Sequence, residues 1–140
     1  MQQRRSDHDV TGTVQVSSAP AVRHAIEELF ASVWPGQPFA VFGPVFQDFE
    51  RMFTGHMPGY FGVDTVYHDQ QHTLDITLAT ARLICGYELQ AESGARFGAV
   101  RSTVGFIIAS FQDVGYLRKP CESERANGAE FTSVHASRGA

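Results

Sequence analysis

The stretch YHDQQHTLDITLATARLICGYELQ, residues 67–90, decides the fold that we expect for this chain of 140 residues. Its pattern of apolar and polar residues predicts one long helix over 67–90. On a helical wheel, His68, His72 and Asp75 share one narrow stripe with Ala79 and Arg82. Apolar residues flank this stripe on both edges, so we expect the two histidines and Asp75 to face inward.

The opposite side of the same helix carries polar residues, among them Thr73, Thr77 and Glu88, which we expect at the solvent side. Two imidazoles four residues apart on one helical face can converge on one site. Buried ionisable groups are costly unless they are paired or bind a metal. The pattern therefore fits a metal site, and it fits equally well two core histidines that hydrogen-bond to neighbours or to Asp75.

Working outward from this stretch, the spacing of apolar residues predicts four further helices. They cover residues 18–34, with Pro20 in the first turn, then 44–54, 97–112 and a stretch that begins at Ala129. Residues 1–17 are polar and are interpreted as a flexible arm, or at most one short strand. We therefore expect an all-α, irregular helical bundle over residues 18–140.

Several residues are interpreted as structural. The aromatic residues of the first two helices are expected in the core rather than in a ligand cage: Trp34, Phe42, Phe46, Phe49 and Phe53. Cys85 lies on the apolar side of its helix and is expected to be an inert buried thiol. Three other histidines show no partner pattern and are expected at the surface: His8, His24 and His56.

Composition narrows the class of protein. Hydrophobic residues make up 43% of the chain and charged residues 19%, which excludes an intrinsically disordered body. The net charge is −4 with no basic run, so we expect no nucleic-acid partner. The longest apolar stretch is far shorter than the roughly 20 residues that span a bilayer, so we expect no membrane insertion. The two cysteines lie outside any CxxC spacing and suggest a reducing, cytoplasmic setting.

The predicted helix 97–112 is apolar nearly all round, as is typical of a central buried helix, and Asp113 follows its last residue. A carboxylate at this end of a buried helix is disfavoured by desolvation and by the helix dipole, so it calls for a nearby cation. A metal shared with His72 meets that need. The alternative is an ion pair with Arg118 or Lys119.

Two motifs together carry a resemblance to a known family: YHDQQHT at 67–73 and FQDVGYL at 111–117. The pair resembles the HD-domain metal-dependent phosphohydrolases, which include cyclic-nucleotide phosphodiesterases. The resemblance covers residues 60–140 and implies an all-α fold with one or two divalent metals. In the family these are held by a histidine, an adjacent His-Asp pair and a later aspartate. Such metals polarise phosphoryl oxygens and generate a hydroxide from bound water.

By position, the resemblance implies His72 and Asp113 as metal ligands and His68 as the proton donor to the leaving group. Gln112 stands where the family has the histidine of the pair, and its amide oxygen is a weaker ligand for transition metals than imidazole. The segment GAEFTSVH at 128–135 is similar to a bacterial stretch whose histidine helps to hold a second metal, which implies His135 as a ligand. No aspartate follows Asp113, and the expected fold lacks the family's closing C-terminal helices. A weakened site with one metal is therefore expected.

These residues lead to a hypothesis of an HD-type phosphohydrolase that acts on a nucleotide or another phosphate ester with a divalent ion such as Mn, Fe or Mg. The alternative is a catalytically inactive HD-like module that binds a small phosphate-containing ligand or regulates a partner. A haem protein is a third hypothesis, but paired histidines on one helix do not face each other across a pocket. Absence of the closing helices would expose apolar surface, so self-association is also expected.

Overall fold

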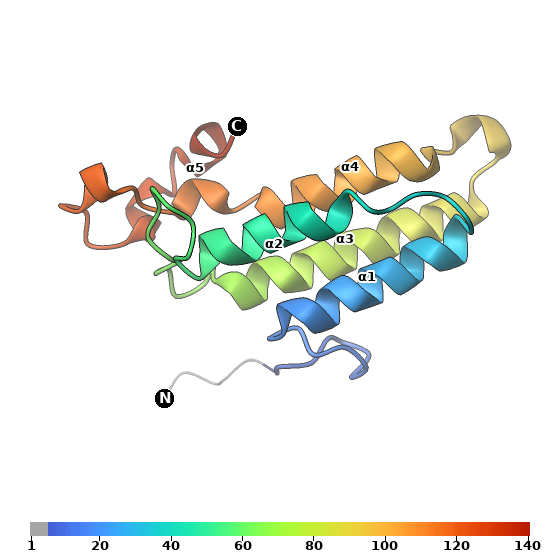
Figure 1. Cartoon of the computed structure of the whole chain (residues 1–140), viewed down its shortest axis with the longest axis horizontal. Helices are drawn as coiled ribbons and strands as arrows, with labels where there is room; N and C mark the ends of the chain where they lie inside the picture. The colour runs from blue at the N-terminus through green and yellow to red at the C-terminus, as the bar shows by residue number, and fades with distance from the viewer. Residues whose placement is uncertain (1–5) are drawn as a thin grey trace.

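The computed structural model describes residues 6–140 and confirms an all-α fold. Its helices are α1 (Ala19–Val33), α2 (Phe42–Phe53), α3 (Gln70–Gln90), α4 (Gly98–Phe111) and α5 (His135–Arg138). Figure 1 shows α1 to α4 packed side by side, with the chain beyond α4 gathered at one end of this bundle. Within the described residues, β pairing is limited to one isolated bridge between His8 and Gln15.

The first two helices match the predicted ranges to within two residues. Ser18 caps α1, because its hydroxyl accepts a hydrogen bond from the backbone N–H of Ala21 at 3.4 Å. Pro20 lies in the first turn, where a missing N–H breaks no helical hydrogen bond. In α2 the phenylalanines recur three or four positions apart and bury one face of the helix.

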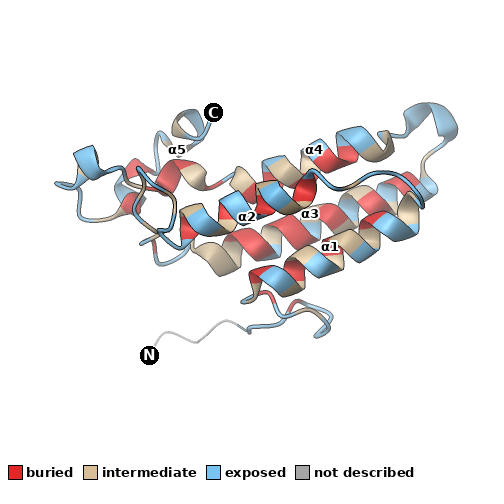
Figure 2. Ribbon diagram, in the orientation of Figure 1, coloured by how far each residue is buried: buried red, intermediate tan, exposed pale blue. Residues whose placement is uncertain are grey.

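The core lies between α1, α2, α3 and α4, and Figure 2 shows buried positions on all four helices. Within it, phenylalanines of α1, α2 and α4 form an aromatic cluster. The four phenylalanines of α2 are each at most 2% exposed, which confirms them as core: Phe42, Phe46, Phe49 and Phe53. Phe39 joins two helices, since its ring stacks on Phe30 of α1 at 4.0 Å and on Phe42 at 4.8 Å. Trp34 is half-buried and packs against the same cluster.

The third helix begins later than predicted. Asp69 is its N-cap, and the carboxylate accepts a hydrogen bond from the backbone N–H of His72 at 2.8 Å. His68 therefore precedes the helix instead of lying on its wheel. Our prediction of the inward stripe is wrong in part, because Asp75 and Ala79 are exposed.

The residues that we expected at the solvent side of α3 are in fact buried. Thr77 donates its hydroxyl hydrogen to the carbonyl of Thr73 at 2.7 Å, so its one polar group is satisfied within the helix. Glu88 accepts hydrogen bonds from the backbone N–H groups of Phe97 and Gly98 at the start of α4. These polar groups can be buried against α4 because each has a partner, which the wheel alone does not reveal.

The fourth helix buries only one side, contrary to the prediction of a fully buried central helix. Val100, Val104 and Ile108 are exposed, while Phe106 and Ala109 are buried. An apolar sequence does not specify which of its faces has neighbours, and α4 packs mainly against α2 and α3.

Two ends of the chain also differ from the predictions. The predicted helix from Ala129 is a short 3-10 turn, Gly128–Phe131, followed by the four-residue α5. The segment 6–17 makes defined contacts: Asp9 pairs with Arg82 of α3 at 2.6 Å, and Val16 is fully buried. These contacts argue against a free arm over residues 9–16, and residues 1–5 of the predicted arm lie outside the described residues.

Within residues 6–140 the structure has no helix with the length and apolar character needed to cross a membrane.

Candidate metal centre

Three potential metal ligands meet where α3 begins and α4 ends: His68, His72 and Asp113. His68 Nδ1 lies 3.2 Å from Asp113 Oδ2, and His72 Nε2 lies 3.7 Å from the same oxygen. One ligand atom from each residue lies within 4.8 Å of the other two. The carboxylate is 7% exposed, His72 17% and His68 32%, so solvent reaches the group mainly past His68. We call these three residues the triad.

Local structure fixes each member of the triad. The Asp69 cap sets the first turn of α3 and with it the position of His72. His68 lies in the preceding loop, where Thr65 donates its hydroxyl hydrogen to the His68 carbonyl at 2.6 Å. Asp113 follows the last turn of α4, where the negative end of the helix dipole disfavours a buried carboxylate. The two imidazoles are the polar side chains that face its carboxylate.

The alternative partners for Asp113 are excluded by their positions. Arg118 Nη2 lies 2.7 Å from Asp64 Oδ2, and its Nη1 donates to the carbonyl of Arg125 at 2.9 Å. Lys119 is exposed, with its Nζ 5.9 Å from the centre of the Tyr60 ring. The alternative of an ion pair between Asp113 and one of these cations is therefore wrong, whereas the proximity of Asp113 to His72 agrees with the sequence analysis.

Aromatic rings surround the imidazoles. Tyr116 is buried, and its ring stacks on His68 at 4.3 Å between centres and on His135 at 4.5 Å. The Tyr67 ring lies 4.7 Å from that of His72. Sequence analysis assigned no role to either tyrosine, although both belong to the two quoted motifs. The available signal was their position, because Tyr67 directly precedes His68 and Tyr116 follows Asp113 by three residues.

The other predicted site residues lie near the triad without joining it. His135 comes closest, with its ring centre 6.4 Å from that of His68. Its Nδ1 lies 2.8 Å from the carbonyl of Thr132, and because a carbonyl only accepts, Nδ1 carries the proton. The neutral ring therefore keeps its lone pair on Nε2. Gln112 is the exposed C-cap of α4, next to Asp113 in the chain, and Asp75 is exposed on α3.

The triad has the donor types and nearly the spacing that a metal ion requires. Donor atoms on one tetrahedral ion, with bonds of about 2.1 Å, lie about 3.4 Å apart. The two His–Asp distances of 3.2 and 3.7 Å already fall close to this value. Two imidazoles and a carboxylate suit Zn²⁺, Fe²⁺ or Mn²⁺, and three protein ligands leave coordination positions for water or substrate.

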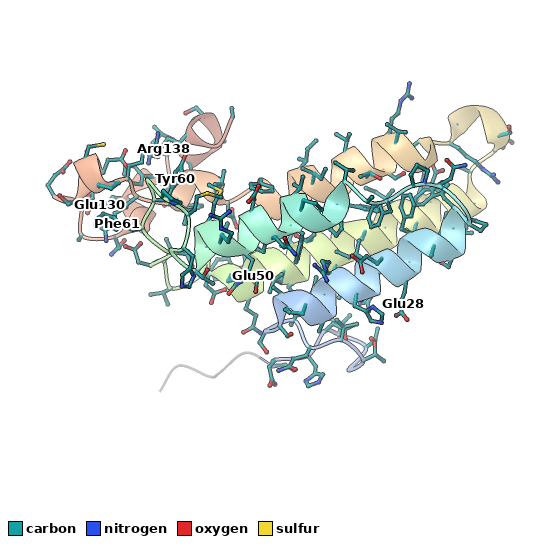
Figure 3. The ribbon with its side chains drawn as sticks, in the orientation of Figure 1. Glu28, Glu50, Tyr60, Phe61, Glu130 and Arg138 are labelled. Carbon is teal, nitrogen blue, oxygen red and sulfur yellow. The ribbon has the colours of Figure 1, made fainter. Side chains whose placement is uncertain are left out.

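A cavity of about 350 Å³ adjoins the turn Val114–Tyr116, and Tyr60 and Arg138 are among its lining residues. Figure 3 labels these two side chains. Arg138 is already engaged there. It pairs with Glu122 at 2.6 Å and donates to the carbonyl of Gly115 at 2.9 Å. We therefore assign Arg138 to holding the C-terminal segment in place.

The fold and the site define an all-α chain with a candidate metal-binding group of two histidines and one aspartate. Comparisons of the chain with family models, with curated proteins and with solved structures find no match.

Proposed function

We propose that this chain binds one divalent transition metal at the triad and uses it as an HD-type phosphohydrolase on a nucleotide or another phosphate ester. The observation that carries the proposal is the convergence of His68, His72 and Asp113 on one point. The triad joins residues from both motifs of the resemblance, although His68 and Asp113 are 45 positions apart in sequence. A metal with open coordination positions is typical of hydrolytic centres.

Each residue has a role in this proposal. His72 and Asp113 hold the ion, and His68 supplies a third donor instead of acting only as a proton donor. When bound, such an ion supplies Lewis acidity toward a phosphoryl oxygen and lowers the pKa of a water molecule. Tyr116 holds the His68 ring by stacking, which fixes the direction of its donor atom.

His135 and Gln112 keep secondary roles in the proposal. The Nε2 lone pair of His135, near His68, suits an acid–base group or a ligand of a second ion. Gln112 is proposed as a substituted ligand or as an amide that orients water. The variant Gln112→His tests this role, because imidazole is the stronger ligand. We expect about tenfold tighter Mn²⁺ binding; unchanged affinity would remove Gln112 from the site.

A second candidate is a non-catalytic HD-like module that binds a small phosphate-containing ligand. It is favoured by one specific observation: the two imidazoles lie 3.2 and 3.7 Å from the same Asp113 oxygen, so they already serve as polar partners for the buried carboxylate. In that case the triad is a structural polar contact that joins the start of α3 to the end of α4. The two candidates differ in whether the triad binds a metal ion that supports turnover.

The experiment is hydrolysis of bis(p-nitrophenyl) phosphate in the presence of Mn²⁺ by the unchanged chain and by His72→Ala. The control is His24→Ala, because His24 is an exposed helical histidine that faces only Glu28, 3.4 Å away. Activity lost in His72→Ala and kept in His24→Ala supports the enzyme. No Mn²⁺-dependent turnover in any of the three proteins, together with a thermal stability that saturating Mn²⁺ leaves unchanged, supports the module. Equal turnover in both variants would contradict the assignment of the triad as the catalytic metal site.

A further inference from the structure

The outer surface of α3 and α4 carries a continuous apolar face. Six residues with large apolar side chains form it, and we call them the outer face: Leu83, Tyr87, Phe97, Val100, Val104 and Ile108. The α4 members recur every four residues, and the rings of Tyr87 and Phe97 lie 4.9 Å apart, which joins the two helices. Ile84 and Gly105 meet between the helices, so the two halves of the face are adjacent.

The exposure of these side chains is high for a protein surface. Val100 is 79% exposed, Leu83 75% and Ile108 65%. The only charged residue of α4 is Arg101, so charge interrupts the α4 part of the face once. Scattered apolar residues need no explanation, but a contiguous patch of several hundred Å² marks an interaction site.

The area of the outer face matches one side of a protein interface. With about 150 to 250 Å² for each large side chain, the exposed fractions of the six residues amount to about 650 Å² of surface. A standard interface buries about 800 Å² per partner. The six residues and their immediate rim therefore supply about the area that a stable dimer needs.

The shape of the face favours a second copy of the same chain over another occupant. Two neighbouring helices form a ridged surface, and ridges spaced four residues apart pack into the grooves of an identical surface. A two-fold axis makes such a contact self-complementary and closes it at two chains. The rise from Val100 to Ile108 covers about two turns of α4, at about 1.5 Å per residue, which suits helix-on-helix contact.

We propose that the chain forms a symmetric dimer through the outer face, with α4 of each copy at the centre of the interface. The proposal is independent of the proposed function, because its residues lie on α3 and α4 away from the triad. Val104 is the central α4 position, four residues from both Val100 and Ile108. Aromatic anchors at the edge, Tyr87 and Phe97, are of the type enriched in interfaces.

The test is sedimentation equilibrium of the unchanged chain and of Val104→Glu over a dilution series. The unchanged chain is expected at twice its mass of 15.4 kDa. Val104→Glu places an uncompensated charge at the centre of the interface and is expected to raise the dissociation constant about 100-fold or more. The matched control is Val10→Glu, because Val10 is fully exposed on the N-terminal segment; this variant is expected to stay dimeric.

Several results would overturn the proposal. A monomeric unchanged chain at every concentration contradicts it, and so does a dimer that Val104→Glu leaves intact. Open-ended assembly contradicts the two-fold geometry. Circular dichroism checks that the variant keeps its helices, and Leu83→Lys on α3 is the second variant if Val104→Glu does not fold. The mass of the unchanged chain in solution shows by itself, without any variant, whether the chain is a monomer or a dimer.

Discussion

The bundle α1 to α4 and the segment 112–140 are held together by different kinds of contact. The bundle is joined by buried apolar side chains from every helix, with the phenylalanines of α2 at its centre. Apart from Leu117, which packs in the same core, the segment is joined by ion pairs and by close backbone contacts, such as Arg138 with Glu122 and Gly115 with His135. The triad lies at the boundary: the start of α3 and the loop before it supply His72 and His68, and the segment supplies Asp113, two residues after α4 ends, together with the neighbouring Tyr116. Burial should therefore determine whether the chain folds, and the polar contacts should determine how the rings around the triad are held.

The largest effect is expected from the core of the bundle. Phe46→Ala removes a fully buried ring and should lower the free energy of unfolding by about 3–5 kcal/mol. Urea unfolding followed by circular dichroism measures this loss. Phe61→Ala is the control, because Phe61 is 39% exposed and stacks only under Arg118; its loss should stay below about 1 kcal/mol. Equal losses would show that the aromatic cluster does not hold the bundle.

The next largest effect is expected for a variant that destabilises the segment and leaves the bundle unchanged. A Cβ at Gly115 would lie 1.8 Å from the carbonyl oxygen of His135, so Gly115→Ala forces α5 away from the turn Val114–Tyr116. Overpacking of this kind costs about 1–3 kcal/mol. Hydrogen exchange should rise over residues 128–140 and stay unchanged in α1 and α3. The control is Gly43→Ala in α2, where a Cβ meets no atom within 4 Å; faster exchange throughout the bundle would contradict the separation.

Acid should also weaken the attachment of the segment 112–140, because it protonates Glu122, the partner of Arg138. The hydrogen bond from Arg138 is the largest cause that holds the pKa of Glu122 at about 2, below its ordinary 4.5. Because the folded pKa is lowered, the stabilisation is complete above pH 4.5 and is lost as the pH falls toward 2. Hydrogen exchange over residues 128–140, corrected for its intrinsic pH dependence, should show this loss. Glu122→Gln should remove most of the pH dependence, and a profile unchanged in that variant would exclude the pair as its origin.

The smallest effect is expected from chemical modification of the two cysteines, one in the bundle and one in the segment. Cys85 is buried in α3, and burial raises the pKa of its thiol to about 11, whereas Cys121 is exposed in the segment. Thiolate is the reactive form, so a thiol reagent near neutral pH should modify Cys121 first. Cys85 should react only at the rate at which the bundle opens. Counting modified thiols over time by mass spectrometry checks this order, and simultaneous reaction of both would contradict a closed bundle.

Sequence patterns predicted the bundle well because its helices follow apolar periodicity. The phenylalanines of α2, the Ser18 cap and the range of α4 all depend on local rules. The helical wheel gave the wrong buried side for part of α3, because some of its polar side chains have hydrogen-bond partners inside the protein. Thr77 and Glu88 are buried because a carbonyl and two N–H groups satisfy them, and no periodicity contains that information.

The candidate site was predicted in part. His72 and Asp113 were paired from the dipole argument and from the resemblance, and the structure brings them together. His68 was expected on the helix, but the Asp69 cap leaves it in the loop before α3. The stacking of Tyr116 between two predicted site residues depends on how the chain returns after α4. That return is set by long-range contacts such as Arg138 with Glu122, which local patterns do not encode.

The central claim is that the triad is a metal centre, and calorimetric titration with Mn²⁺ and Zn²⁺ tests it most directly. We expect one ion per chain, with affinity lowered about 100-fold or more in Asp113→Asn and His72→Ala, because three ligands hold the ion. His24→Ala should bind as the unchanged chain does. Binding of no ion, or of an ion whose affinity is the same in all the variants, would contradict the claim and leave the triad as a structural contact between the start of α3 and the end of α4.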